Sequence, residues 1–139
     1  MDSTETAEGR TDFIDRGVAT TKTRDVESYG KLLMDDLQYE DVTCGAVYEG
    51  KEAFLDYYRT WLRTFPDFEM TTFPSAITTE RAAVPWVITA TYGDPLPGLP
   101  QEIARGSHVT LKGISTVEFG RGDSISAIKE YYVVAEVRP

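Results

Sequence analysis

The order of predicted elements indicates an α+β fold, with helices on one face of a mostly antiparallel sheet. Apolar residues recur at helical spacing in three early segments: residues 13–20, 23–36 and 51–65. Alternation with period two dominates after residue 68. The chain of 139 residues suits one domain and has no internal repeat. We therefore expect a single domain over residues 1–139, with residues 1–8 as a loose tail.

The third helical segment carries the clearest pattern. Within YEGKEAFLDYYRTWLRTFPDFEM, residues 48–70, an aromatic stripe recurs at helical spacing: Phe54, Tyr58, Trp61 and Phe65. Gly50 is a suitable N-cap. Pro66 ends the helix, because a proline disfavours the α conformation in the residue before it. Such a stripe most often packs in a core, although aromatic rings also line ligand pockets.

Two carboxylates flank this helix in strands. In LQYEDVT, residues 37–43, alternation places Asp41 on the same face as Leu37 and Tyr39. We expect that face to look inward, with Asp41 on the buried side. Glu69 lies in the strand after the helix, where the two faces are not distinguished by the pattern.

In the second half of the chain, the alternation of apolar and polar residues predicts three long strands. The first, around AAVPWVITATY, has inward Val84 and Trp86, and Pro85 indicates an edge position or a bulge. A Pro- and Gly-rich loop over residues 93–107 follows, and we expect it at the rim of a pocket. The last two strands, around residues 108–119 and 124–137, are joined by a GRGD turn, which forms a hairpin.

Composition excludes several classes of function. The net charge is −9 and no basic stripe is visible, so nucleic acids and anionic membranes are not expected partners. With one cysteine, Cys44, and one histidine, His108, a zinc site is not expected. We expect no metal and no organic cofactor. No segment has the apolar length of a signal or a membrane span, so we expect a soluble, cytoplasmic protein.

Several stretches together resemble a known family. The element order, the YEGKEAFLDYYRTWLRTFPDFEM segment, the PLPGLP loop and the strands HVTLKGISTVEF and SAIKEYY resemble SnoaL-like proteins of the nuclear transport factor 2-like superfamily. The resemblance covers about residues 10–136. It implies a cone-shaped α+β barrel, in which a curved, mostly antiparallel sheet wraps around a long helix with two N-terminal helices. It also implies a pocket between sheet and helices, and a homodimer.

The resemblance also suggests catalytic residues. Asp41 falls where ketosteroid isomerases carry their base, and Asp41 with Glu69 matches a pair in epoxide-opening enzymes of polyether biosynthesis. Many SnoaL-like cyclases carry an aspartate where this chain has Val133. This difference counts against the usual SnoaL-type mechanism, unless Glu130 substitutes for that aspartate. The isomerase oxyanion hole is not matched, since Ser115 stands at its acid position and the first helix has no tyrosine. The Asp and Arg residues of limonene-type epoxide hydrolases are also missing.

We therefore expect an acid–base enzyme of secondary metabolism acting on a small apolar oxygenated molecule, such as a polyketide or terpenoid intermediate. Epoxide opening by Asp41 as base and Glu69 as acid is the leading reaction. One alternative is an aldol-type cyclase or isomerase with Asp41 as sole base. A noncatalytic binding or dimerisation module is another. Expected pocket residues are Tyr48, Tyr58, Trp61, Phe65, Trp86, His108 and Tyr131. For Glu69 and His108, solvent exposure is the competing interpretation.

Overall fold

The computed structural model describes residues 6–99 and 101–139. Its helices are α1 (Ala7–Lys22), α2 (Val26–Gly30) and α3 (Lys51–Thr64). Its strands are β1 (Leu33–Asp41), β2 (Ala46–Glu49), β3 (Glu69–Thr72), β4 (Ala76–Ile77), β5 (Arg81–Thr91), β6 (His108–Phe119) and β7 (Ile125–Arg138). The expected α+β class is confirmed.

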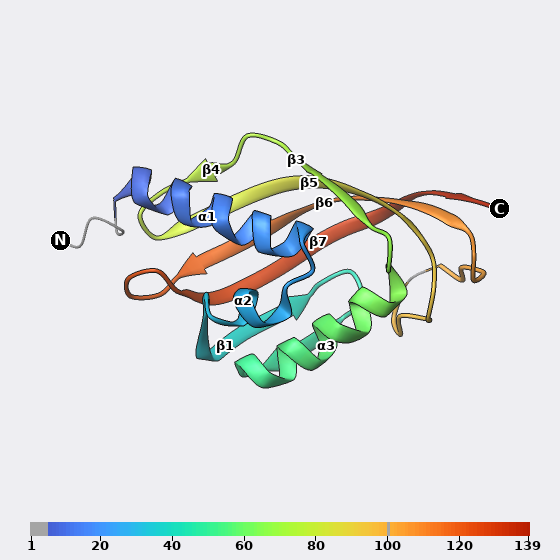
Figure 1. Ribbon diagram of the computed structural model, residues 1–139, viewed down its shortest axis with the longest axis horizontal. Coiled ribbons are helices and arrows are strands. Elements are labelled where there is room, and N and C mark those ends of the chain that lie inside the picture. The colour runs from blue at the N-terminus through green and yellow to red at the C-terminus, as the bar shows by residue number, and fades with distance from the viewer. Residues whose placement is uncertain (1–5, 100) are drawn as a thin grey trace.

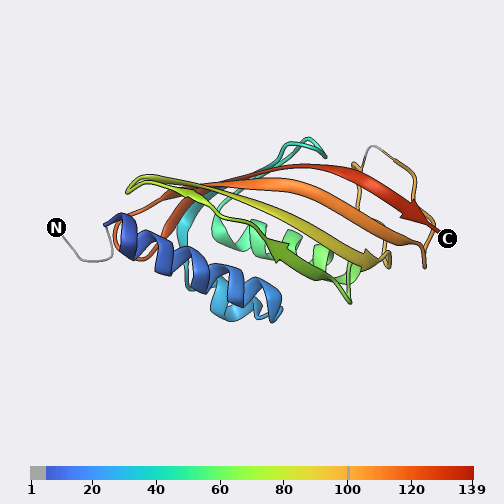
Figure 2. The same ribbon diagram turned by 90° about the horizontal axis from the view of Figure 1, so that it is seen from above.

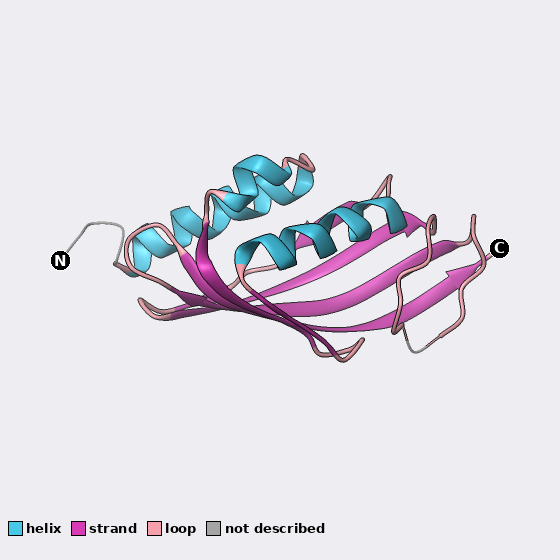
Figure 3. Ribbon diagram, turned by 90° about the horizontal axis from the view of Figure 1, so that it is seen from below, coloured by secondary structure: helices cyan, strands magenta, loops and turns pink. Residues whose placement is uncertain are grey.

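The strands form one curved, unclosed sheet in the order β2-β1-β7-β6-β5-β3, with β4 paired to β5. Strands β1 and β7 run parallel, and every other pairing described is antiparallel. Figures 1 and 3 show the three helices on the concave face, with α1 crossing one end of the sheet and α3 the other. This arrangement is the expected cone, and its interior lies between the sheet and the helices.

Before strand β5, four elements differ from the sequence prediction. Helix α1 begins at Ala7, capped by the Thr6 side chain, so only residues 1–5 of the predicted tail lie outside the described residues. Helix α2 has only five residues and ends at Gly30, because the following segment pairs as β1 from Leu33. The short strands β2 and β4 were not predicted. Each is too short to show a period of its own.

Helix α3 forms as its sequence predicts. Gly50 precedes it with a φ of 94°, a conformation that glycine adopts without strain. The stripe is buried at Phe54, Tyr58 and Phe65, the last of them completely. Truncating a fully buried phenylalanine costs about 3–5 kcal/mol, so this stripe is a main support of the fold. After Pro66, the Asp67 carboxylate accepts hydrogen bonds from the backbone and hydroxyl of Thr91 on β5.

Pro85 is neither on an edge strand nor in a bulge, contrary to the prediction. Strand β5 lies between β6 and the pair β3 and β4. Pro85 faces the break between those two short strands, where the backbone N–H of Phe73 donates to its carbonyl oxygen. Its missing N–H is therefore not needed for strand pairing.

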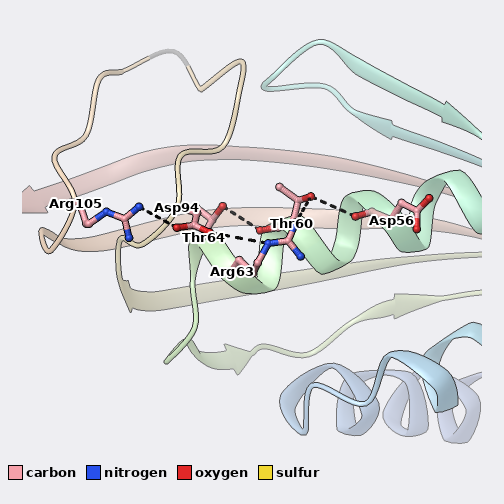
Figure 4. Close-up of polar contacts among 6 residues, drawn as sticks. All are labelled: Asp56, Thr60, Arg63, Thr64, Asp94 and Arg105. Atoms are coloured by element: carbon pink, nitrogen blue, oxygen red, sulfur yellow. Dashed lines mark hydrogen bonds and ion pairs between the residues drawn. The ribbon is translucent and has the colours of Figure 1, made fainter.

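The loop over residues 93–107 is fastened to the end of α3. The backbone N–H of Gly93 donates to the carbonyl oxygen of Thr64, and Asp94 forms ion pairs with Arg63 and Arg105 (Figure 4). Gly98 packs against Cys44 so closely that a Cβ there would lie 2.9 Å from its carbonyl oxygen. None of the described loop residues lines the cavity between sheet and helices, so the expected rim is not found.

Candidate active site

A cavity of about 150 Å³ lies between the concave sheet face and the helices. Its walls are largely apolar and aromatic. Helix α1 contributes Ile14 and Val18, and α3 contributes Phe54, Tyr57, Tyr58 and Trp61. The polar groups of its sheet wall are few: Asp41, Ser115, Glu130 and Tyr132, with Thr72 at β3, the Tyr39 hydroxyl and the Trp86 indole. A pocket of this kind, apolar with a few convergent polar groups, is typical of small-molecule sites.

Asp41 ends strand β1 and is 1% exposed. Its oxygens receive three hydrogen bonds. The hydroxyls of Tyr57 and Tyr132 both donate to Oδ2, each at 2.8 Å. The backbone N–H of Cys44, in the turn after the strand, donates to Oδ1 at 2.9 Å. Three donors directed at one carboxyl group fit its ionised form, which only accepts.

Glu130 on β7 is the second carboxyl group of the cavity. It accepts a hydrogen bond from the hydroxyl of Ser115, which in turn accepts one from Nε1 of Trp86 at 2.9 Å. Burial raises the pKa of Glu130 to about 8, with a further rise from the charge of Asp41, while the Ser115 hydrogen bond acts in the opposite direction. Glu130 therefore keeps its proton near neutral pH.

Strand register explains how these side chains meet. Asp41 pairs with Glu130 across β1 and β7, and Glu130 pairs with Ser115 across β7 and β6. Paired residues on neighbouring strands point to the same face of a sheet. The three polar side chains therefore form one row across the concave face, with a carboxyl group on each of two adjacent strands.

The hydroxyls around Asp41 are held neutral. Burial raises the pKa of both Tyr57 and Tyr132 well above the usual range for tyrosine, and the charge of Asp41 raises both further. The Cys44 sulfur lies 3.0 Å from the Tyr132 hydroxyl. Burial also raises the pKa of the Cys44 thiol to about 11, which argues against a thiolate nucleophile.

Three of the predicted pocket residues line the cavity: Tyr58, Trp61 and Trp86. Phe65 instead lies fully inside the core, packed against Trp61 with ring centroids 4.9 Å apart. Tyr48 stacks on Tyr57 at 4.7 Å and supports the wall from behind. Neither of these two residues is among the cavity lining.

The other predicted residues lie on the outer face of the sheet. Glu69 is exposed and does not line the cavity, so the expected pair with Asp41 is not formed. His108 is also exposed and shares a shallow outer depression with Glu69 and Arg138. Tyr131 points outward, and its neighbour Tyr132 takes the inward position. In each strand, alternation directs these side chains away from the cavity.

Tyr57 and Tyr132 were not predicted from the sequence as partners of Asp41. Glu130 and Ser115 were noted only through the family resemblance, and not as neighbours of each other. Tyr57 follows the helical stripe at i+3 from Phe54, so its inward position was open to prediction. The contact between Tyr132 and Asp41 depends on the parallel pairing of β1 with β7, which no local pattern reveals.

No group of three or more His, Cys, Asp or Glu side chains able to hold a metal ion is found among residues 6–99 and 101–139. Within the same part of the chain, no helix has both the length and the apolar character needed to cross a membrane.

A curved, unclosed sheet folded over three helices is the cone fold of the nuclear transport factor 2-like class. Within this class the chain belongs to the SnoaL-like domain family, whose family model matches residues 14–128. Among curated proteins, none matches the sequence.

Solved structures with this fold include enzymes of several kinds. An epoxide hydrolase/cyclase-like enzyme, SalBIII, with a role in pyran ring formation in the polyether salinomycin, superposes with a TM-score of 0.77 at 12% identity, covering 96% of this chain and 98% of that chain. AclR, a hydroxylase candidate from Streptomyces galilaeus, gives 0.74 at 16% identity, with coverages of 94% and 82%. A ketosteroid isomerase candidate from Kribbella flavida superposes with a TM-score of 0.65 at 19% identity, covering 91% of this chain and 79% of that chain. At these identities the likeness shows the fold alone.

Proposed function

We propose that the protein is an acid–base enzyme of secondary metabolism that opens an epoxide in a small, mostly apolar, oxygenated molecule. One observation carries the proposal: Asp41 and Glu130 occupy paired positions on β1 and β7, and both line the same apolar cavity. Their environments separate their roles. Asp41 accepts three hydrogen bonds, whereas the pKa of Glu130 is raised to about 8, mainly by burial. Two carboxyl groups with divergent environments are suited to act as base and acid.

In the proposed reaction, Glu130 gives its proton to the epoxide oxygen as a carbon–oxygen bond of the ring breaks. A hydroxyl group of the substrate, or a water molecule, forms the new carbon–oxygen bond. Its proton passes to the Tyr132 hydroxyl, which gives its own proton to Asp41 over the 2.8 Å hydrogen bond. Glu130 ends as a carboxylate and Asp41 as an acid, and proton exchange with solvent restores both.

The surroundings of Asp41 weigh against the alternative in which it is the sole base of an isomerase. Such a reaction needs a hydrogen-bond donor for the developing oxyanion. Tyr57 and Tyr132 already donate to Asp41, so their protons are not free for that task. Glu130 remains as the proton donor, and as a neutral carboxyl group it can protonate an epoxide oxygen. The noncatalytic module stays the competing class, and turnover separates the two.

The test uses an aryl-substituted epoxy alcohol whose hydroxyl can close a five- or six-membered ring. Products are measured by liquid chromatography and mass spectrometry in ¹⁸O-labelled water, which marks hydrolysis but not ring closure. We expect Glu130→Gln and Asp41→Asn each to lower turnover by about 10²–10⁴-fold. Glu69→Gln is the matched control, since Glu69 lies on the outer face, and it should retain wild-type turnover. Wild-type turnover in Glu130→Gln would refute the proposal.

A further inference from the structure

The helical wall of the cavity carries a polar group that the proposed reaction does not use. Tyr58 on α3 is 5% exposed and lines the cavity. Its hydroxyl oxygen is buried and has no hydrogen-bond partner within the described structure. Folded proteins leave few such groups unpaired, because a buried hydroxyl without a partner is unfavourable. An unpaired hydroxyl in a ligand cavity therefore indicates a partner supplied by the ligand.

Aromatic packing fixes the position of this hydroxyl. The Tyr58 ring lies edge-on to Tyr29, with centroids 5.2 Å apart, and edge-on to Trp61 at 6.3 Å. It also contacts Phe54 at 6.0 Å. A ring enclosed on several sides cannot turn its hydroxyl out to solvent. The group is therefore preorganised for a ligand atom.

Thr21 and Arg24, two polar side chains that act on Tyr58, already donate their own protons elsewhere. The Thr21 hydroxyl donates to the carbonyl oxygen of Gly17. Arg24, held at a φ of 59°, donates to the carbonyl oxygen of Phe68 and stacks on its ring at 4.8 Å. Burial raises the pKa of Tyr58 to about 12, whereas an interaction with the Thr21 side chain, which falls outside normal hydrogen-bond geometry, and the charge of Arg24 lower it. Tyr58 thus stays a neutral hydroxyl at physiological pH, with its proton available to a ligand oxygen.

We infer that Tyr58 is a second ligand-binding group, which donates a hydrogen bond to an uncharged ligand oxygen away from the reacting carbon. The inference builds on the proposed function, since it concerns the ligand of the same cavity. Asp41 and Glu130 belong to the sheet wall, whereas Tyr58 belongs to the helical wall. The ligand class is therefore an apolar molecule with oxygen at two separate places: one at the acid pair, and an ether, carbonyl or hydroxyl oxygen at Tyr58.

The experiment compares two binding probes of nearly equal size by isothermal titration calorimetry. One is a naphthol with a methoxy group on the far ring, and the other carries an ethyl group there instead. The ratio of the two Kd values is measured in wild type and in Tyr58→Phe. We expect the substitution to shift this ratio against the methoxy probe by about two- to tenfold, the range of one hydrogen bond. Tyr131→Phe, outside the cavity, should leave the ratio unchanged.

Two further measurements make the outcome decisive. Glu130→Gln should keep the Tyr58-dependent ratio, so a failure of the acid–base proposal is distinguishable from a failure of this one. Tyr58→Phe should leave Tm unchanged or raise it, because it removes an unpaired buried hydroxyl. The inference would be overturned if Tyr58→Phe left the ratio of the two Kd values unchanged. It would also be overturned if the Tm of Tyr58→Phe fell markedly below that of wild type. The second result would mean that the hydroxyl has a partner within the folded protein.

Discussion

Asp41 and Glu130 are register partners on the parallel strands β1 and β7, and both side chains enter the same cavity. The pairing joins the end of the first strand to the middle of the last. It places a carboxyl group that accepts three hydrogen bonds beside one that burial keeps protonated. The stability and pH behaviour of the protein should report this relationship directly.

The first prediction concerns stability against pH. The pKa of Glu130 is raised from 4.5 to about 8 in the folded protein, mainly by burial. Between these values the unfolded chain releases a proton that the folded protein retains. Glu130 therefore lowers the free energy of unfolding as pH rises, by at most about 1.4 kcal/mol per pH unit. Its favourable contribution is complete below pH 4.5 and is lost as pH rises through about 8.

Glu130→Gln should remove this slope. Denaturant unfolding of the variant and wild type between pH 4 and 9 measures the difference, and other titrating groups cancel in it. The stability of the variant relative to wild type should increase through the window. Glu69→Gln, the exposed control, should follow wild type. Parallel curves for Glu130→Gln and wild type would show that Glu130 titrates normally.

The second prediction concerns Asp41, whose carboxylate is held by three donors. Burial of a charge alone would suggest that Asp41→Asn relieves an unfavourable group. The structure indicates the opposite, because an amide offers one acceptor oxygen to donors from Cys44, Tyr57 and Tyr132. We expect a loss of about 1–3 kcal/mol in the free energy of unfolding. Asp36 is exposed on the same strand, so Asp36→Asn is the control and should have little effect on the free energy of unfolding. If Asp41→Asn also left the free energy of unfolding unchanged, that result would contradict the hydrogen-bond network.

The elements that could be predicted from the sequence were those in which apolar residues recur at a regular helical or strand spacing without interruption. Leu37 and Tyr39 fixed the inward phase of Asp41, and the structure confirms all three as buried. The stripe of α3 was equally clear. For β3, Phe73 obscured the phase, because it is an exposed apolar side chain on the same outer face as Glu69.

Alternation along strand β7 does not by itself distinguish Tyr131 from Tyr132 as the inward residue. Ile125 and Ile128 are both buried, although strict alternation would put them on opposite faces. A register shift at the start of the β6–β7 pair adds one residue on β7 and resets the phase. Counting by two from Ile125 reaches Tyr131, whereas counting from Ile128 reaches Glu130 and Tyr132. Sequence alternation alone does not reveal such a shift.

The third prediction concerns association, and we propose that the outer sheet face packs against a second copy of the chain. Three large apolar side chains are exposed there: Phe73 (48%), Tyr131 (40%) and Val133 (60%). Proline and isoleucine side chains lie in the same rows, since Pro85 pairs with Ile114 and Ile114 with Tyr131. A contiguous apolar patch of this kind is typical of an interface.

Sedimentation equilibrium at tens of micromolar should give the mass of a homodimer. Val133→Glu should shift the protein to monomer, because the substitution brings a charge into the proposed interface of an already acidic chain. Glu136→Gln, also exposed on β7, is the control and should remain dimeric. A wild-type monomer under these conditions would contradict the proposal.

The last prediction concerns Ser115, the third member of the polar row. Its hydroxyl donates to Glu130 and lowers the pKa of that carboxyl group against the larger effect of burial. Ser115→Ala should therefore move the pKa of Glu130 above its value of about 8, which is measured by NMR titration of the Glu130 side-chain carbon. If Glu130 is the acid, the high-pH limb of turnover should move upward with it, since the proton is held over a wider range. Ser126→Ala removes a hydroxyl that donates to a backbone carbonyl near the hairpin, and it should leave the titration unchanged. An unchanged pKa of Glu130 in Ser115→Ala would mean that Ser115 has no part in setting its protonation, and a fall would mean that water solvates the carboxylate better than the serine does.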